Sequence, residues 1–186
     1  MRGARRTTLL FGAALAAGAM LPACNHEPQA PDYRDVAPDP VSLMDAFESY
    51  ETVDAVRATV VHATLLEEFE QEARSGAPAY EQVMLQVVDW FHLDHGGVLN
   101  LEFFNDRLLS VVFYPRQAET YSGRLRDVLT ARGFEVGGLR SGSRWEARSG
   151  HAVVRSLNDL DGPRFLWLDE RLVKQADQWE ALHGVP

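Results

Sequence analysis

The strongest constraint on the fold is a pair of alternating apolar runs between residues 99 and 113. Every second residue of each run is apolar: Leu99, Leu101 and Phe103, then Leu109, Val111 and Phe113. A period of two places such side chains on one face of an extended strand. Asn105 and Asp106, between the runs, tolerate the backbone of a tight turn. The pattern therefore predicts an antiparallel β-hairpin.

Four further strands follow from shorter patterns. Alternation over residues 82–91 predicts a strand before the hairpin, and β-rich segments predict strands over 144–148, 151–157 and 164–168. The sequence leaves open whether residues 59–72 form a strand or a helix.

Three helices are predicted from capping residues and apolar spacing. Ser49 or Thr52 can cap a helix in which valines recur at helical spacing. Pro115 is typical of a first helical turn, and Gly133 of a helix end. Asp169 is expected to cap the last helix, whose apolar stripe includes Leu172 and Trp179.

These elements predict an α+β fold. Consecutive hairpins form an antiparallel sheet, and we expect the helices to pack on one face of it. Strands followed by a helix occur twice, around residues 80–132 and 134–183, so the order also predicts a loose two-fold repeat.

Composition fits one soluble globular domain. The chain has 186 residues, of which 46% are hydrophobic and 10% aromatic, more than a disordered chain carries. Its single cysteine excludes a disulfide framework and a cysteine-rich zinc fold.

The first residues have the features of an export signal. Arg2, Arg5 and Arg6 precede an apolar run from Leu9 to Leu21, and small residues follow. A positive segment, a short apolar segment and small residues define a secretory signal peptide. Thirteen apolar residues are too few for a membrane span, which needs roughly 20.

The signal ends in Leu21-Pro22-Ala23-Cys24, which resembles the lipobox of bacterial lipoproteins. The resemblance implies that residues 1–23 are removed as the signal peptide and that Cys24 carries diacylglycerol and an acylated, for example palmitoylated, N-terminus. Asn25 favours the outer membrane, because an aspartate at this position tends to retain lipoproteins in the inner membrane. We therefore expect an anchor at the periplasmic face of the outer membrane.

Residues 24–40 contain the lipidated Cys24 and a proline-rich, charged stretch that predicts an extended tether. At roughly 3.1 Å per residue it reaches up to about 50 Å. Residues 41–186 then form the single globular domain. Loss of three arginines with the signal peptide lowers the basic residues from 18 to 15 against 27 acidic ones, a net charge of −12. This balance argues against nucleic-acid binding.

One segment has metal-ligand residue types. His92, Asp94 and His95 lie within four positions, and two imidazoles with a carboxylate can bind zinc. The segment resembles the end of the His-x-His-x-Asp-His motif of metallo-β-lactamase-type hydrolases, although Trp90 stands where that motif begins. The purely structural alternative is a polar turn formed by Gly96-Gly97.

Two surface features allow other roles. Glu67, Glu68, Glu70 and Glu72 form an acidic run, which can face a basic partner or hold divalent ions, although a solvated surface is the usual explanation. Exposed aromatic residues such as Phe104, Tyr114 or Trp167 would suit a small-ligand or glycan binder.

No serine or cysteine lies in a recognisable catalytic motif. We therefore predict a lipid-anchored lipoprotein of the cell envelope that is not an enzyme, needs no cofactor and acts as an interaction or envelope-maintenance module with an envelope protein partner. The alternatives are a zinc-dependent envelope hydrolase using His92, Asp94 and His95, and the ligand or glycan binder.

Overall fold

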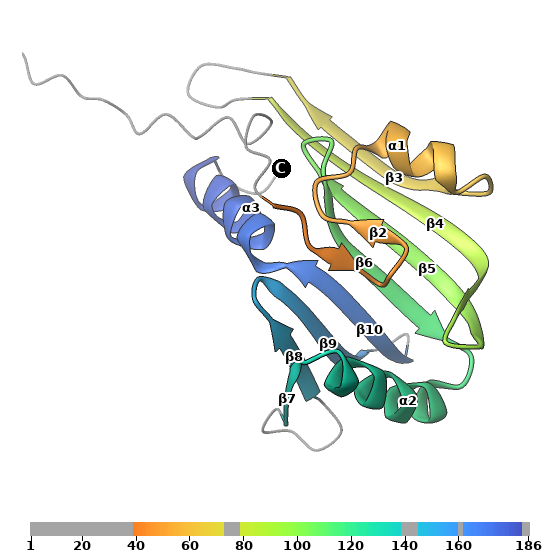
Figure 1. Ribbon diagram of the computed structural model, residues 1–186. Helices are drawn as coiled ribbons and strands as arrows, with labels where there is room; N and C mark the ends of the chain where they lie inside the picture. Colours follow the sequence, from red (N-terminus) through yellow and green to blue (C-terminus); the bar gives the residue numbers. More distant parts are fainter. Residues whose placement is uncertain (1–38, 73–78, 139–144, 160–161, 184–186) are drawn as a thin grey trace, which may run out of the picture.

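The computed structural model describes residues 39–72, 79–138, 145–159 and 162–183 (Figure 1). The signal peptide, Cys24 and most of the tether lie outside these residues. The elements agree with the predicted class: the chain is α+β, with a mostly antiparallel sheet and three helices.

Eight antiparallel strands form the main sheet, in the order β3-β4-β5-β6-β10-β9-β8-β7. Their bounds are β3 Thr64–Gln71, β4 Tyr80–His92, β5 His95–Phe104, β6 Leu108–Pro115, β7 Glu135–Gly138, β8 Trp145–Ser149, β9 Ala152–Asp159 and β10 Gly162–Asp169. The two four-stranded meanders meet at β6 and β10, where Phe113 lies opposite Phe165. Strand β3 forms one edge of the sheet and β7 the other.

A short hairpin and three helices complete the chain. Their bounds are β1 Ser42–Leu43, β2 Phe47–Glu48, α1 Val53–Thr59, α2 Ala118–Ala131 and α3 Glu170–His183. Of the two predicted caps of α1, the structure confirms Thr52, whose hydroxyl accepts a hydrogen bond from the Ala55 amide at 3.2 Å. The left-handed Gly133 (φ 83°) follows α2, as expected of a residue that ends a helix.

The larger core lies between one sheet face and the layer made by α1, α2 and the β1–β2 hairpin. Strand residues two apart point to this face, as the sequence predicted. The core contains Val83, Leu85, Leu99, Leu101, Phe103, Val111, Phe113, Phe165, Tyr121 and Leu125, all at most 2% exposed.

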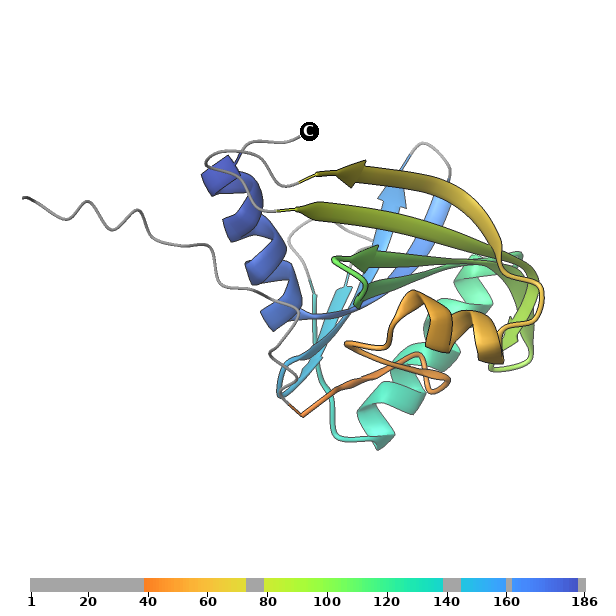
Figure 2. The same cartoon turned by 90° about the horizontal axis from the view of Figure 1, so that it is seen from above.

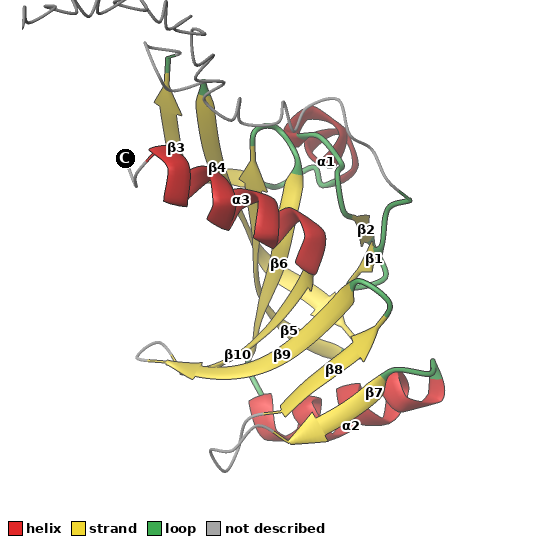
Figure 3. Ribbon diagram, turned by 90° about the vertical axis from the view of Figure 1, so that its left-hand side faces the viewer, coloured by secondary structure: helices red, strands yellow, loops and turns green. Residues whose placement is uncertain are grey.

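The expectation that the helices gather on one face is wrong for α3. Its Ala176 and Trp179 pack with Tyr80 and Phe104 in a second cluster. Phe104 follows Phe103 in β5, so the two side chains point to opposite faces. Figures 2 and 3 show α3 across the sheet from α1 and α2. This position shields apolar rings of the second face that water would otherwise contact.

The predicted 99–113 hairpin is confirmed, and residues 64–71 prove to be strand. Two details differ from expectation. Pro115 ends β6 instead of opening a helix, since α2 begins three residues later. The turn before β5 is made by Leu93 and Asp94, whose φ angles are 50° and 64°, and not by Gly96-Gly97, which lie within the strand.

Gly97 has a different role in β5. A Cβ atom there would lie 2.3 Å from the Tyr114 carbonyl oxygen and 2.7 Å from the Phe113 ring. Only glycine permits this close approach of β5 to β6.

Four strands followed by one helix occur in both halves of the chain. A two-fold axis perpendicular to the sheet would place both helices on the same face. Because α2 and α3 lie on opposite faces, such an axis does not relate the two halves together with their helices. The loose two-fold repeat stays a prediction.

Candidate functional site

The structure separates the three predicted zinc ligands into two groups. His92 ends β4 and His95 begins β5, and the two are register partners on either side of the turn. Their rings lie 5.7 and 5.4 Å from the Tyr121 ring, so the fold brings both imidazoles to one aromatic side chain. Asp94 turns away and pairs with Arg124 at 2.8 Å.

Residues remote in sequence supply the partners of His92. Its Nδ1 lies 2.6 Å from the Tyr121 hydroxyl, and its Nε2 lies 3.5 Å from Asp45 Oδ2. Asp45 also forms an ion pair with Arg132, which follows α2. We call Asp45, His92, Tyr121 and Arg132 the histidine cluster. Nothing in the local sequence around Asp45 signals this role.

Burial and the ion pair with Arg132 together set the protonation of the histidine cluster. Desolvation lowers the pKa of His92, against the attraction of Asp45, so the imidazole is neutral near pH 7. The hydrogen bond from Arg132 lowers the pKa of Asp45 and keeps its carboxylate charged. Burial raises the pKa of Tyr121, which therefore stays a phenol.

The histidine cluster joins three parts of the fold. Asp45 comes from the β1–β2 hairpin, His92 from the end of β4, and Tyr121 from α2. Tyr121 is fully buried, so its hydroxyl has no access to a substrate. No group of three histidine, cysteine or acidic side chains among the described residues is arranged to hold a metal ion. Zinc binding by His92, Asp94 and His95 stays a prediction.

A second polar junction surrounds Asp169, which is fully buried at the end of β10. Its Oδ1 accepts hydrogen bonds from the Arg171 amide at 3.0 Å and from Arg171 Nε at 2.9 Å, so the predicted helix cap is confirmed. Its Oδ2 accepts from Ser49 Oγ at 3.0 Å and from Arg171 Nη2 at 2.6 Å. Although burial raises the pKa of Asp169, these hydrogen bonds outweigh it and the pKa is lowered.

The aromatic residues proposed for ligand binding are not an exposed platform. Phe104 and Trp167 are 2% and 4% exposed, so the expectation that they face solvent is wrong. They lie on opposite sheet faces, each within a core cluster. Tyr114 is half-buried, and its hydroxyl accepts a hydrogen bond from Arg164 at 3.2 Å.

Strand β3 has exposed side chains and an outer edge that is unpaired among the described residues. Every residue from Thr64 to Glu70 is exposed, and no described strand pairs with the outer side of β3 (Figure 3). Among its side chains Leu65 and Leu66 are each 47% exposed, and Phe69 is 40% exposed. None of the ion pairs found within the described residues includes Glu67, Glu68 or Glu70.

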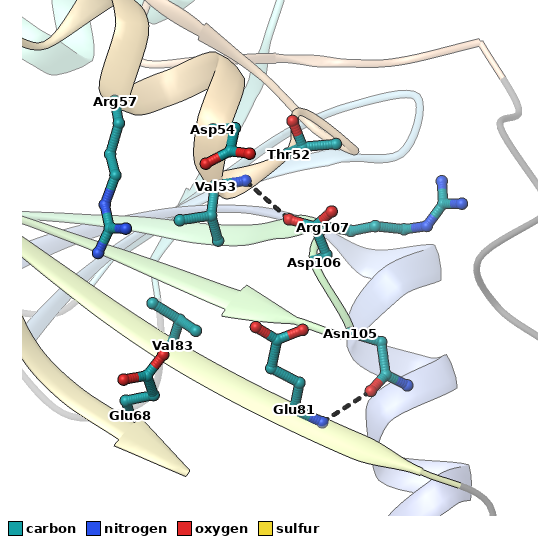
Figure 4. A pocket seen from close by; sticks show the side chains of 10 residues that line it. All are labelled: Thr52, Val53, Asp54, Arg57, Glu68, Glu81, Val83, Asn105, Asp106 and Arg107. Atoms are coloured by element: carbon teal, nitrogen blue, oxygen red, sulfur yellow. Dashed lines mark hydrogen bonds between the residues drawn. The ribbon is translucent and has the colours of Figure 1, made fainter. Parts of the chain in front are cut away.

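An open pocket of about 540 Å³ lies between α1 and strands β3 and β4 (Figure 4). Carboxylates outnumber guanidinium groups by four to two among its lining residues: Thr52, Val53, Asp54, Arg57, Glu68, Glu81, Val83, Asn105, Asp106 and Arg107. Figure 4 shows Arg57 reaching down from α1, while Arg107 points away from the pocket.

Two turn residues build the wall of this pocket. Asp106 Oδ1 accepts a hydrogen bond from the Val53 amide at 2.9 Å, which fixes the N-terminus of α1 over the sheet. Asn105 Oδ1 accepts from the Glu81 amide at 2.9 Å, which ties the β5–β6 turn to β4. The turn residues predicted from sequence therefore hold α1 and β4 in place.

A smaller pocket of about 290 Å³ opens on the other side of β3. It is lined by Glu67, Glu68, Phe69, Gln82 and Met84. Phe69 lies over it, with its ring 5.9 Å from the Tyr80 ring. The outer strand is thus flanked by a pocket on each face: carboxylates and two guanidinium groups line the larger one, and two carboxylates with Phe69 and Met84 line the smaller one.

Comparisons with known proteins give no assignment: no protein-family model, curated protein or solved structure matches the chain. Within the described residues, no helix has the length and apolar character that crossing a membrane requires.

Proposed function

We propose that the chain is a lipid-anchored lipoprotein of the cell envelope, at the periplasmic face of the outer membrane, whose domain is a non-catalytic interaction module. The observation that carries the interaction role is the exposed outer strand β3, with its apolar side chains and with glutamates that join no ion pair among the described residues. The histidine cluster, by contrast, is engaged within the fold.

Exposed apolar side chains support an interaction role. Leu182 (52%) on α3 apart, the large exposed apolar side chains of the described residues lie on β3, on β4 and in the loop before β3: Val61 (81%), Leu65, Leu66 and Phe69, Val88 (59%) and Phe91 (67%). Single exposed apolar residues are ordinary, but a group at one sheet edge is typical of a protein contact surface. An unpaired strand edge adds backbone donors and acceptors to it.

The place where the tether joins the domain agrees with an anchored module. Arg171 Nη2 donates a hydrogen bond to the Asp39 carbonyl at 2.8 Å, so the first described residue is held beside α3. From Cys24 to this point an extended chain reaches about 45 Å. The domain can therefore work at some distance from the membrane while it remains attached.

The anchor is tested by replacing Cys24 with serine. We expect the wild-type chain to fractionate with membranes and to incorporate labelled palmitate, and Cys24→Ser to do neither, because several acyl chains make a stable anchor. Membrane association of Cys24→Ser equal to that of the wild type would disprove lipid anchoring.

The interaction role is tested by photo-crosslinking in cells. A photoreactive amino acid is placed, one position at a time, at exposed sites on the two sheet edges and on the three helices. An interaction module gives a discrete protein adduct from at least one surface, and the adduct weakens in Cys24→Ser. No adduct from any position would remove this function.

The zinc-dependent hydrolase is the alternative that one observation favours, because His92 and His95 are register partners beside one ring. Thermal unfolding of the full chain with zinc, with calcium and with EDTA distinguishes it. A zinc-specific rise in melting temperature that His92→Ala and His95→Ala each abolish would support this alternative.

A further inference from the structure

Strand β3 offers its outer edge in a regular stretch. The β3–β4 register shifts between Leu65 and Glu67, and from Glu67 to Gln71 the pairing is continuous. The backbone donors and acceptors on the outer side of this stretch have no partner strand among the described residues. An extended segment can add to such an edge by main-chain hydrogen bonds, with alternate side chains pointing to the two faces.

The two faces beside this stretch differ in chemistry. Glu68 and Glu70 lie opposite Val83 and Glu81, on the face of the 540 Å³ acidic pocket. Glu67 and Phe69 lie opposite Met84 and Gln82, on the face of the 290 Å³ pocket. The side chains of an added strand would alternate between a face with two β3 carboxylates, Glu68 and Glu70, and a face where Glu67 lies beside the apolar Phe69 and Met84.

Charge also argues against a second copy of this chain as the occupant. If β3 paired with β3 of another molecule, Glu67, Glu68 and Glu70 would lie against the same carboxylates. Like charges opposite each other across a sheet are destabilising. The occupant that fits carries positive charge.

We propose that β3 binds, as an added strand, an extended segment of a partner protein in which basic and apolar side chains alternate. The basic side chains lie opposite Glu68 and Glu70 beside the acidic pocket. The apolar ones lie on the other face, opposite Glu67 and Phe69 and on the side of Met84. This inference rests on the proposed interaction function and specifies its partner.

The probe is a fluorescent octapeptide in which four arginines and four valines alternate. Its control is the isomer with four consecutive arginines followed by four valines, which has the same charge and composition. Fluorescence anisotropy is measured with the full chain in a non-ionic detergent. We expect the alternating peptide to bind at least tenfold more tightly than the block isomer. Equal affinities would mean that the peptide binds through nonspecific charge attraction, and would overturn the proposal.

The protein variant is Glu68→Gln/Glu70→Gln, which keeps side-chain size and removes two charges from β3. The matched control is Asp127→Asn/Asp177→Asn, which removes two charges from exposed positions on α2 and α3. We expect the β3 variant to bind the alternating peptide about tenfold more weakly, and the control variant to bind within twofold of wild type. Equal effects of the two variants would contradict a site on β3.

Two readouts separate this inference from the proposed function. If crosslinking yields a partner only from surfaces away from β3, the interaction function stands and the strand-addition site is wrong. If the full chain forms a dimer that Glu68→Gln/Glu70→Gln strengthens, a second copy occupies β3 and the basic partner is wrong. Added salt is expected to weaken peptide binding, because the charges involved are exposed.

Discussion

The carboxylate at the Asp169 junction is buried and hydrogen-bonded, whereas those of the outer strand β3 are exposed to solvent. Asp169 is fully buried and accepts four hydrogen bonds, three from Arg171 and one from Ser49. Glu67, Glu68 and Glu70 are exposed and take part in none of the ion pairs found in the described structure. A buried charge requires such partners, whereas a solvated one does not. The comparison indicates that the first site holds the fold together, whereas the second is the surface that we propose binds a partner.

The histidine cluster belongs with Asp169 in this comparison. Both sites fasten the β1–β2 region to the sheet: Ser49, just after β2, bonds to Asp169, and Asp45, between the two strands, lies beside His92. Each joins residues far apart in the chain, so each is closed only in the folded state. Changes at these two sites should therefore alter stability, and changes on β3 should alter binding.

The largest effect is expected from Asp169→Ala. The substitution removes the acceptor of Ser49 and of Arg171 and leaves the Arg171 guanidinium without its counter-charge. Breaking a buried, hydrogen-bonded pair in this way costs about 3 kcal/mol in the free energy of unfolding. Urea denaturation measures it, with Asp177→Ala on the exposed side of α3 as the control. A loss no larger than that of the control would show that the junction does not hold the fold together.

Acid should weaken the same sites. The pKa values of Asp169 and Asp45 are lowered in the folded state, so their contribution is complete above the pKa of the unfolded chain and is lost as the pH falls below about 4. For the buried Asp169 such a contribution is about 2 kcal/mol, whereas the Asp45 side chain is 40% exposed and solvent screening makes its contribution smaller. Urea midpoints across pH 3 to 7 test the expectation, and Asp169→Asn should flatten the acid limb.

The pKa of His92 is lowered as well, so its neutral form contributes stability that begins to fall once the pH drops below about 6.5. His92→Gln should remove the part of the pH dependence that lies above the carboxylate range. A wild-type stability that rises between pH 6.5 and 5 would contradict this sign.

Much of the sheet could be predicted because its signal is local. The alternation of Leu99, Leu101 and Phe103 is compatible with one structure, a strand with one buried face, and neighbouring elements bury that face of β5. Strand β3 could not be distinguished from a helix, because every residue from Thr64 to Glu70 is exposed and such an edge strand needs no alternation of apolar residues. The sheet face on which α3 packs could not be predicted either, since it depends on which aromatic rings the folded sheet leaves uncovered.

The candidate sites follow the same division. His92 stood out in the sequence, but its partners Asp45 and Tyr121 lie 47 and 29 positions away, and only the fold brings them together. The acidic run of glutamates could be identified from the sequence alone. Its position on an outer strand between two pockets required the strand order, which is a non-local property.

Tyr121→Phe should have a smaller effect than the loss of Asp169. It removes one hydroxyl and leaves His92 Nδ1 buried without its partner, while the aromatic packing against Phe113 and Phe165 remains. A lost hydrogen bond of this kind costs about 1 kcal/mol. Tyr114→Phe, at a half-buried hydroxyl, is the control and should cost less. If the two variants unfold at the same urea concentration, the bond to His92 contributes nothing measurable.

The smallest effect on stability is expected where binding should change most. Glu68→Gln/Glu70→Gln removes charge from exposed positions, and surface substitutions of this kind change stability by about 0.5 kcal/mol at most. The sign should be a slight gain, because Glu70 lies opposite Glu81 across the β3–β4 ladder and like charges repel. Urea denaturation of this variant and of Asp127→Asn/Asp177→Asn measures the difference. A loss comparable to that of Tyr121→Phe would mean that the β3 carboxylates serve the fold, and any weakened binding would then follow from a damaged edge rather than from missing charge.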